Sequence, residues 1–180
     1  MIRPTLAISL FLLSKSATAA EYDRSDWGVW SDFDNDCMNT RHEVLLIQAH
    51  GTAKLSPDGC YVSTGRWFDP YTGKVFNRSS ELDVDHIVPL KWAYDHGGGN
   101  WTAKAKVSFG NDMENLIAVD DGTNQSKGAK GPDEWLPPNH QYRCQYLADW
   151  KHLIEKYKLK LRSAEFRIFN KQLTACGIGK

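Results

Sequence analysis

Hydrophobic and polar positions alternate most clearly in residues 82–88, where Leu82 and Val84 alternate with Asp83 and Asp85. This period of two predicts a strand with one buried face, and Pro89 ends it. Near the C-terminus the apolar residues follow helical spacing instead, which predicts amphipathic helices over 141–158 and 163–175. The other predicted elements are a helix over 40–50, a β-hairpin over 60–76, helices over 90–96, 102–109 and 121–127, and a strand over 116–119. We therefore expect an α+β fold, with residues 21–36 as an irregular lead-in.

Local signals support several of these boundaries. Thr40-Arg-His-Glu43 fits a capping box that opens the first helix, and Gly51 is expected to end it. Pro70-Tyr-Thr-Gly73 is typical of a turn and predicts the bend of the hairpin. Gly97-Gly-Gly99 is expected to stop the short helix that starts at Leu90.

The first 20 residues have the pattern of a secretory signal peptide. Arg3 provides the positive end, residues 6–13 form the apolar stretch, and residues 17–19 (Ala-Thr-Ala) fit the cleavage pattern. Eight residues are too few to span a bilayer as a helix. We therefore expect a secreted protein that has no membrane segment after cleavage and consists of one monomeric domain, residues 21–180.

The chain contains four cysteines, an even number, and no closely spaced pair that would suggest zinc binding. In an exported protein this composition favours two disulfides, for which three pairings are open. The local pairing Cys37–Cys60 and Cys144–Cys176 would close each end of the chain, and it is the one we predict.

Overall composition is that of a globular protein, and it argues against a disordered or collagen-like chain. Of the 180 residues, 22 are basic and 22 acidic, so no global positive field recruits nucleic acid or anionic membrane. The charge is uneven, however. Residues 21–126 hold 9 basic and 17 acidic side chains, and residues 127–180 hold 11 and 5. The acidic part is expected to gather cations and the basic part phosphates.

The residues with candidate chemistry lie between 83 and 127. Asp85 and His86 come at the end of the predicted strand, and Asn115 precedes the next strand. Asn124 and Lys127 follow on a short predicted helix. The predicted order is strand, long connection, strand and helix. These elements carry one histidine, one central asparagine and, on the helix, one oxygen ligand.

Six sequence motifs make this pattern specific. They are W-x-D-P-Y-T-G (67–73), D-V-D-H-I-V-P-L (83–90), F-G-N-D (109–112), N-L-I-A-V (115–119), N-Q-S-K-G (124–128) and E-W-L-P-P (134–138). Together they resemble the HNH branch of the His-Me finger (ββα-metal) nucleases. They are most similar to secreted HNH proteins related to the C-terminal domain of GmrSD-type restriction enzymes. The likeness runs from about Cys37 to Cys176, and it implies a ββα-metal core (83–128) with flanking helices, a β-hairpin and two disulfides.

The resemblance also implies a role for each residue. His86 would be the general base, and neutral imidazole suits that task near neutral pH. Asp85 and Asn124 would hold the metal, because oxygen ligands suit Mg²⁺ or another divalent cation such as Mn²⁺. Asn115 would brace the loop that carries His86, and Lys127 would contact phosphate.

Some positions leave alternatives open. Many relatives carry two zinc-binding cysteines where this chain has Asp120 and Thr123, so no structural zinc is expected there. Asp83 and Asp112 compete with the named residues for metal binding, and Asn111 competes with Asn115 for the central position. Arg41, on the first helix, is a weaker candidate.

The function implied is a secreted, metal-dependent endonuclease that hydrolyses phosphodiester bonds, with DNA favoured over RNA. The resemblance implies products with 5′-phosphate and 3′-hydroxyl ends. Base specificity is expected to be low, because no helix-turn-helix or zinc finger is evident. The rival interpretation is a secreted binding or effector module that retains the nuclease scaffold without turnover. The other histidines and the seven tryptophans are interpreted as core or surface residues rather than functional groups.

Overall fold

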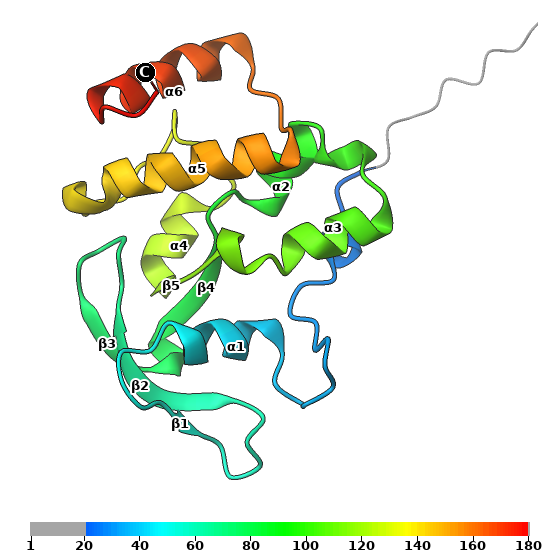
Figure 1. Ribbon diagram of the computed structural model, residues 1–180, viewed down its shortest axis with the longest axis vertical. Coiled ribbons are helices and arrows are strands. Elements are labelled where there is room, and N and C mark those ends of the chain that lie inside the picture. Colours follow the sequence, from blue (N-terminus) through cyan, green and yellow to red (C-terminus); the bar gives the residue numbers. More distant parts are fainter. Residues whose placement is uncertain (1–20, 180) are drawn as a thin grey trace, which may run out of the picture.

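The computed structural model describes residues 21–179, which form a mixed α+β fold (Figure 1). The expected signal peptide, residues 1–20, lies outside the described residues. The α-helices of the described part are α1 (Thr40–Ile47), α2 (Leu90–Asp95), α3 (Ala103–Gly110), α4 (Asp121–Lys127), α5 (Arg143–Tyr157) and α6 (Ser163–Ala175). The strands are β1 (Lys54–Leu55), β2 (Val62–Phe68), β3 (Val75–Arg78), β4 (Leu82–His86) and β5 (Leu116–Asp120). The α+β expectation is confirmed.

The strands form two antiparallel sheets. One has the order β1-β2-β3 and contains the predicted hairpin, whose turn places Gly73 at φ 76°, a conformation that glycine adopts without steric cost. The other is the pair β4-β5, in which Leu82 lies opposite Asp120 and His86 lies opposite Leu116. Helix α4 follows β5 directly, so β4, β5 and α4 form one compact unit, with α2, α3, α5 and α6 on one side and α1 and the hairpin on the other (Figure 1).

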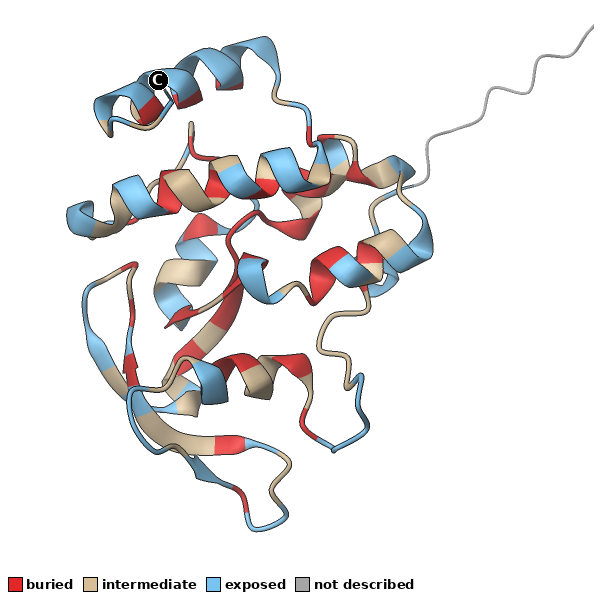
Figure 2. Ribbon diagram, viewed as in Figure 1, coloured by how far each residue is buried: buried red, intermediate tan, exposed pale blue. Residues whose placement is uncertain are grey.

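Two hydrophobic clusters enclose this unit. One lies among α2, α3, α5 and α6 and includes Trp27, Trp92 and Trp150. The other joins α1 and β2 to one face of the β4-β5 pair through residues such as Leu45 and Trp67. The unit is therefore held between two cores, and nearly all of β4 is buried (Figure 2).

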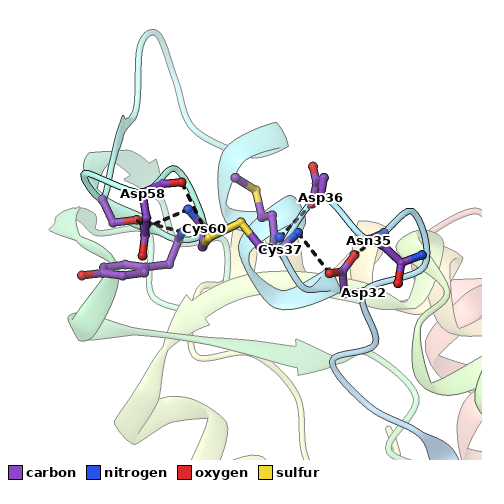
Figure 3. Close-up of a disulfide and its surroundings, with 9 residues drawn as sticks. Asp32, Asn35, Asp36, Cys37, Asp58 and Cys60 are labelled. Carbon is purple, nitrogen blue, oxygen red and sulfur yellow. Dashed lines mark hydrogen bonds between the residues drawn. A yellow bond between two sulfur atoms is a disulfide. The ribbon is translucent and has the colours of Figure 1, made fainter.

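Both predicted disulfides are present. Cys37 bonds to Cys60 and thereby joins the segment before α1 to the segment before β2 (Figure 3). Cys144 bonds to Cys176 and joins the start of α5 to the end of α6. The Asp32 carboxylate accepts hydrogen bonds from the main-chain amides of Asn35 and Cys37, which shapes the loop that leads into the first disulfide.

Two sequence expectations are corrected at the N-terminal end. Helix α1 is capped by Asn39, whose side chain accepts from the His42 amide, and not by Thr40; it ends at Ile47, before Gly51. The lead-in is also not fully irregular, because Arg24–Trp27 form a 3₁₀ turn, η1, and Trp27 is completely buried. A single turn is too short to produce a periodic pattern, so the sequence did not reveal it. Contacts with residues far away in the chain hold it in place.

Within residues 21–179, no helix has the length and apolar character needed to cross a bilayer.

Candidate active site

His86 lies at the end of β4 with its side chain almost fully buried. Its Nε2 is 2.8 Å from the main-chain oxygen of Gly110, at the end of α3. A carbonyl oxygen only accepts, so Nε2 carries the proton and Nδ1 keeps its lone pair. Burial lowers the pKa of His86 to about 3, and the nearby charges of Arg24 and Lys127 favour the neutral form further. The imidazole is therefore neutral, and Nδ1 is the nitrogen that can accept a proton.

Trp30 covers one side of this imidazole. The two ring centroids are 5.5 Å apart and the planes are inclined by 20°. Trp30 belongs to the segment before α1, which lies far from β4 in the sequence. The base candidate is thus held by a carbonyl at one edge and by an indole on one face.

Asp85 points to the opposite face of β4, because neighbouring strand residues alternate. Its Oδ2 accepts a hydrogen bond of 2.7 Å from the Tyr71 hydroxyl and lies 2.8 Å from the ammonium group of Lys127. The Lys127 side chain is completely buried and also donates to the main-chain oxygen of His86, at 2.8 Å. Burial raises the pKa of Asp85 and lowers that of Lys127, and their mutual attraction opposes both shifts.

Asn124 lies within the short helix α4, on the face directed to β4. Its Nδ2 donates to Asp83 Oδ2 at 3.0 Å. This bond fixes the amide so that Oδ1 is the atom left for a ligand. At the start of the same helix, Asp120 accepts from both the amide and the hydroxyl of Thr123. Asp120 and Thr123, where no structural zinc was expected, therefore form a helix cap.

The two candidate central asparagines have different partners. Asn115 is completely buried; its Oδ1 accepts from the Val88 amide at 2.8 Å and its Nδ2 donates to the Val88 oxygen at 3.2 Å. Asn111 instead accepts from the Ser31 amide and donates to the Gly28 oxygen. Asn115 thus holds the loop after His86, and Asn111 holds the N-terminal segment against the end of α3.

A cavity of about 300 Å³ lies at the end of β4. Asp85, His86 and Asn124 all line it, although they come from a strand and a helix separated by more than 30 residues. Asn115 and Lys127 are not among its lining residues and lie behind it, in the protein interior. Further lining residues are Tyr22 and Arg24 from the N-terminal segment, Pro89, Leu90 and Lys91 from the start of α2, and Gln125, Gly128 and Ala129 from α4 and its end.

The donor atoms at this cavity fit a hard divalent cation. The Asp85 carboxylate and the free Oδ1 of Asn124 are oxygen ligands, the type that Mg²⁺ and Mn²⁺ bind. Asp83 does not line the cavity, but its carboxylate lies beside Asn124 and accepts from the amide. Each carboxylate oxygen has two lone pairs, so Asp85 can accept from Tyr71 and Lys127 and still offer a lone pair to a cation.

The remaining sequence candidates have structural contacts. Arg41 donates to the main-chain oxygen of Leu82 at 2.9 Å and so ties α1 to the start of β4. Asp112 accepts from Lys156 and Tyr157 of α5. Neither residue lines the cavity.

Sequence reasoning missed the roles of Tyr71, Trp30 and Arg24. Tyr71 lies inside the W-x-D-P-Y-T-G motif, so its contact with Asp85 had a signal in the sequence. Trp30 and Arg24 belong to the segment interpreted as an irregular lead-in, and no pattern marked them.

Comparison with known proteins gives one family. The family described as "GmrSD restriction endonucleases, C-terminal domain" matches residues 32–166. A protein of Arthroderma benhamiae that is named an uncharacterized secreted protein is 38% identical over 157 residues, which cover 86% of this chain and 76% of the relative. No solved structure matches this chain.

Proposed function

Because this chain belongs to the family of GmrSD restriction endonuclease C-terminal domains, we propose that it is a secreted, metal-dependent endonuclease. Its substrate is nucleic acid, with DNA favoured over RNA, and its reaction is hydrolysis of the phosphodiester bond. The secreted relative and the two disulfides support the extracellular location.

One observation carries this proposal. The lone pair at His86 Nδ1 is available because Nε2 donates to Gly110, and His86 lines the same cavity as Asp85 and Asn124. Hydrolysis of a phosphodiester needs a base for the attacking water and a cation near the phosphate. The residues that line the cavity include a neutral base candidate and two side chains with oxygen ligands.

The order β4, β5 and α4 supports a ββα-metal core for the same site. Two antiparallel strands are followed directly by a helix, and that helix supplies Asn124. In this arrangement Asp85 and Asn124 would hold a divalent cation, which supplies electrostatic stabilisation of the charge on the phosphate and the leaving oxygen.

His86 acts on the water. Nδ1 accepts a proton from the water as its oxygen attacks phosphorus, and the bond from phosphorus to the 3′-oxygen breaks. The leaving oxygen takes up a proton, so the products carry a 5′-phosphate and a 3′-hydroxyl. The Gly110 carbonyl keeps the proton on Nε2 and thereby fixes which nitrogen is the base.

The proposed roles of Asn115 and Lys127 are indirect. Asn115 positions the loop after His86 through its two bonds to Val88. Lys127 was expected at the phosphate, but its ammonium group is buried between Asp85 and the His86 carbonyl. We assign it the task of orienting Asp85 and balancing its charge.

Plasmid cleavage by the disulfide-intact protein tests this function. We expect nicking with Mg²⁺ or Mn²⁺, none with EDTA, and a loss of at least about 100-fold for His86→Ala. Arg66→Gln is the matched control, because Arg66 is exposed on β2 and does not line the cavity. Equal cleavage by wild type and His86→Ala would remove His86 from the mechanism.

The same geometry is also compatible with an alternative function, that of a binding module. Both oxygens of Asp85 already have partners in Tyr71 and Lys127. This arrangement also suits a catalytically inactive site in a protein that binds its ligand without turnover. Absence of cleavage with DNA and RNA, tested with several divalent cations and accompanied by tight binding, would favour this rival.

A further inference from the structure

We propose that Arg24 binds the phosphate group of the nucleic-acid substrate at the cavity, and that the N-terminal segment 21–31 is therefore part of the active site. This inference rests on the proposed nuclease function and names a residue that contacts its substrate. The family match begins at residue 32, so Arg24 lies outside the region that defines the family.

The segment is anchored firmly enough to position a side chain. Trp27 is completely buried, with its ring 5.5 Å from that of Phe109 and 5.8 Å from that of Trp101. Asn111 binds the segment through the Gly28 oxygen and the Ser31 amide. Arg24 begins the 3₁₀ turn that ends at Trp27, so the backbone that carries it is tied to the core within three residues.

The close approach of the segment to α3 is built into the sequence. A Cβ atom at Gly110 would lie 2.3 Å from the main-chain oxygen of Trp27, so this position accommodates only glycine without a shift. Gly110 is also the residue whose carbonyl accepts the hydrogen bond from His86 Nε2. The same contact therefore places the segment and the base candidate relative to each other.

Arg24 is the cation of the cavity lining that is available to an anion. Its side chain is exposed and is hydrogen-bonded to the neutral Tyr22 side chain, and no carboxylate forms an ion pair with it among residues 21–179. Lys91 also lines the cavity, but its ammonium is bonded to both oxygens of Asp95, at 2.5 and 2.6 Å. Lys127 is buried with Asp85 and does not line the cavity.

The chemistry of arginine suits this position. A guanidinium is always charged and offers a planar fork of donors that matches two phosphate oxygens. The surrounding part of the chain is acidic, with 17 acidic and 9 basic residues over 21–126. A guanidinium without a carboxylate partner at the cavity therefore offsets part of a local field that otherwise repels the substrate backbone.

Steady-state cleavage and equilibrium binding together test the inference. We expect Arg24→Gln to lower kcat/KM by roughly tenfold to a hundredfold, mainly through KM, because one charge-assisted contact is lost. Arg24→Lys should recover part of this loss, because it keeps the charge without the fork. The Arg66→Gln control removes the same charge from an exposed position outside the cavity and should stay within about twofold of wild type.

Binding is measured separately in the His86→Ala background, by fluorescence anisotropy of a labelled DNA duplex between roughly 50 and 200 mM salt. We expect Arg24→Gln to reduce the steepness of log affinity against log salt by about one, the signature of one lost phosphate contact. If Arg24→Gln and Arg66→Gln behave alike in both assays, the inference is overturned while the nuclease function stands. A wild-type protein that neither cleaves nor binds nucleic acid overturns both.

Discussion

The ammonium group of Lys127 lies 2.8 Å from Asp85 Oδ2 although the lysine side chain has no exposed surface. This pair joins the last residue of α4 to the strand that carries His86. The ammonium also donates to the His86 carbonyl, so one side chain contacts the two adjacent residues at the end of β4.

Removal of this ammonium should leave a buried carboxylate without its partner. We expect Lys127→Met to lower the free energy of unfolding by about 3–5 kcal/mol, measured by urea denaturation. The double variant Lys127→Met/Asp85→Asn should recover much of the loss, because no buried charge remains. Lys130→Met, at an exposed lysine, should change stability by less than about 0.5 kcal/mol. A cost below about 1 kcal/mol for Lys127→Met would contradict a compensated buried pair.

The contact between Gly110 and Trp27 predicts a second effect. Gly110→Ala places a methyl group 2.3 Å from the Trp27 oxygen, and we expect a loss of about 1–3 kcal/mol together with reduced cleavage, because the segment and the His86 acceptor both shift. Gly122→Ala is the control. Its added Cβ meets only Asp120 Oδ2, at 3.5 Å, and it lies inside α4, so it should be neutral or slightly stabilising. Equal melting temperatures for the two variants would argue against the close approach.

Asn115 offers an isosteric test of the loop after His86. In Asn115→Asp one carboxylate oxygen can still accept from the Val88 amide, but the other faces the Val88 oxygen, which then loses its donor. We expect a loss of about 1–3 kcal/mol in stability and a decrease in kcat that exceeds the change in KM. Asn170→Asp, on the exposed face of α6, controls for the added charge. An Asn115→Asp protein with wild-type kcat would show that the loop does not need this brace.

The lowered pKa of Glu114 predicts how the stability of the protein depends on pH. Its carboxylate bonds to Lys156 and His152 of α5, and these hydrogen bonds lower the pKa of Glu114 to about 2. The pKa of glutamate in the unfolded chain is about 4.3. The stabilisation by ionised Glu114 is therefore fully present above that pH and is lost as the pH falls towards 2. Urea midpoints over this range should fall less steeply for Glu114→Gln than for wild type. Because the carboxylate is exposed, added salt should weaken the effect. Glu134→Gln, at an exposed residue, should keep the wild-type slope.

Many local features of the fold follow from the sequence alone. Period-two alternation located β4, helical spacing located α5 and α6, and the expected helix over 121–127 agrees with α4. The disulfide pairing was also predicted, because Cys37–Cys60 and Cys144–Cys176 each close a local loop. These features depend on neighbours within one element or on short loops, where the sequence carries the signal directly.

The motifs also indicated which residues belong together. Asp85, His86 and Asn124 were grouped by resemblance, and they do line one cavity. Their spacing could not show the partners of each side chain. Lys127 was expected at the phosphate, yet it is buried against Asp85, because α4 packs its last turn onto β4.

The sequence by itself therefore predicted most of the helices and strands, the two disulfides and, through the resemblance, the residues Asp85, His86 and Asn124. Tertiary structure alone decided that Gly110 accepts the hydrogen bond from His86 Nε2, that Asn111 and Asn115 have separate tasks, and that Trp30 and Arg24 lie at the site. The physical reason is the range of the interactions. Periodicity and motifs report on residues that are close in the chain, whereas these contacts join segments whose separation in sequence is 24 to 83 residues, and they form only when both cores pack.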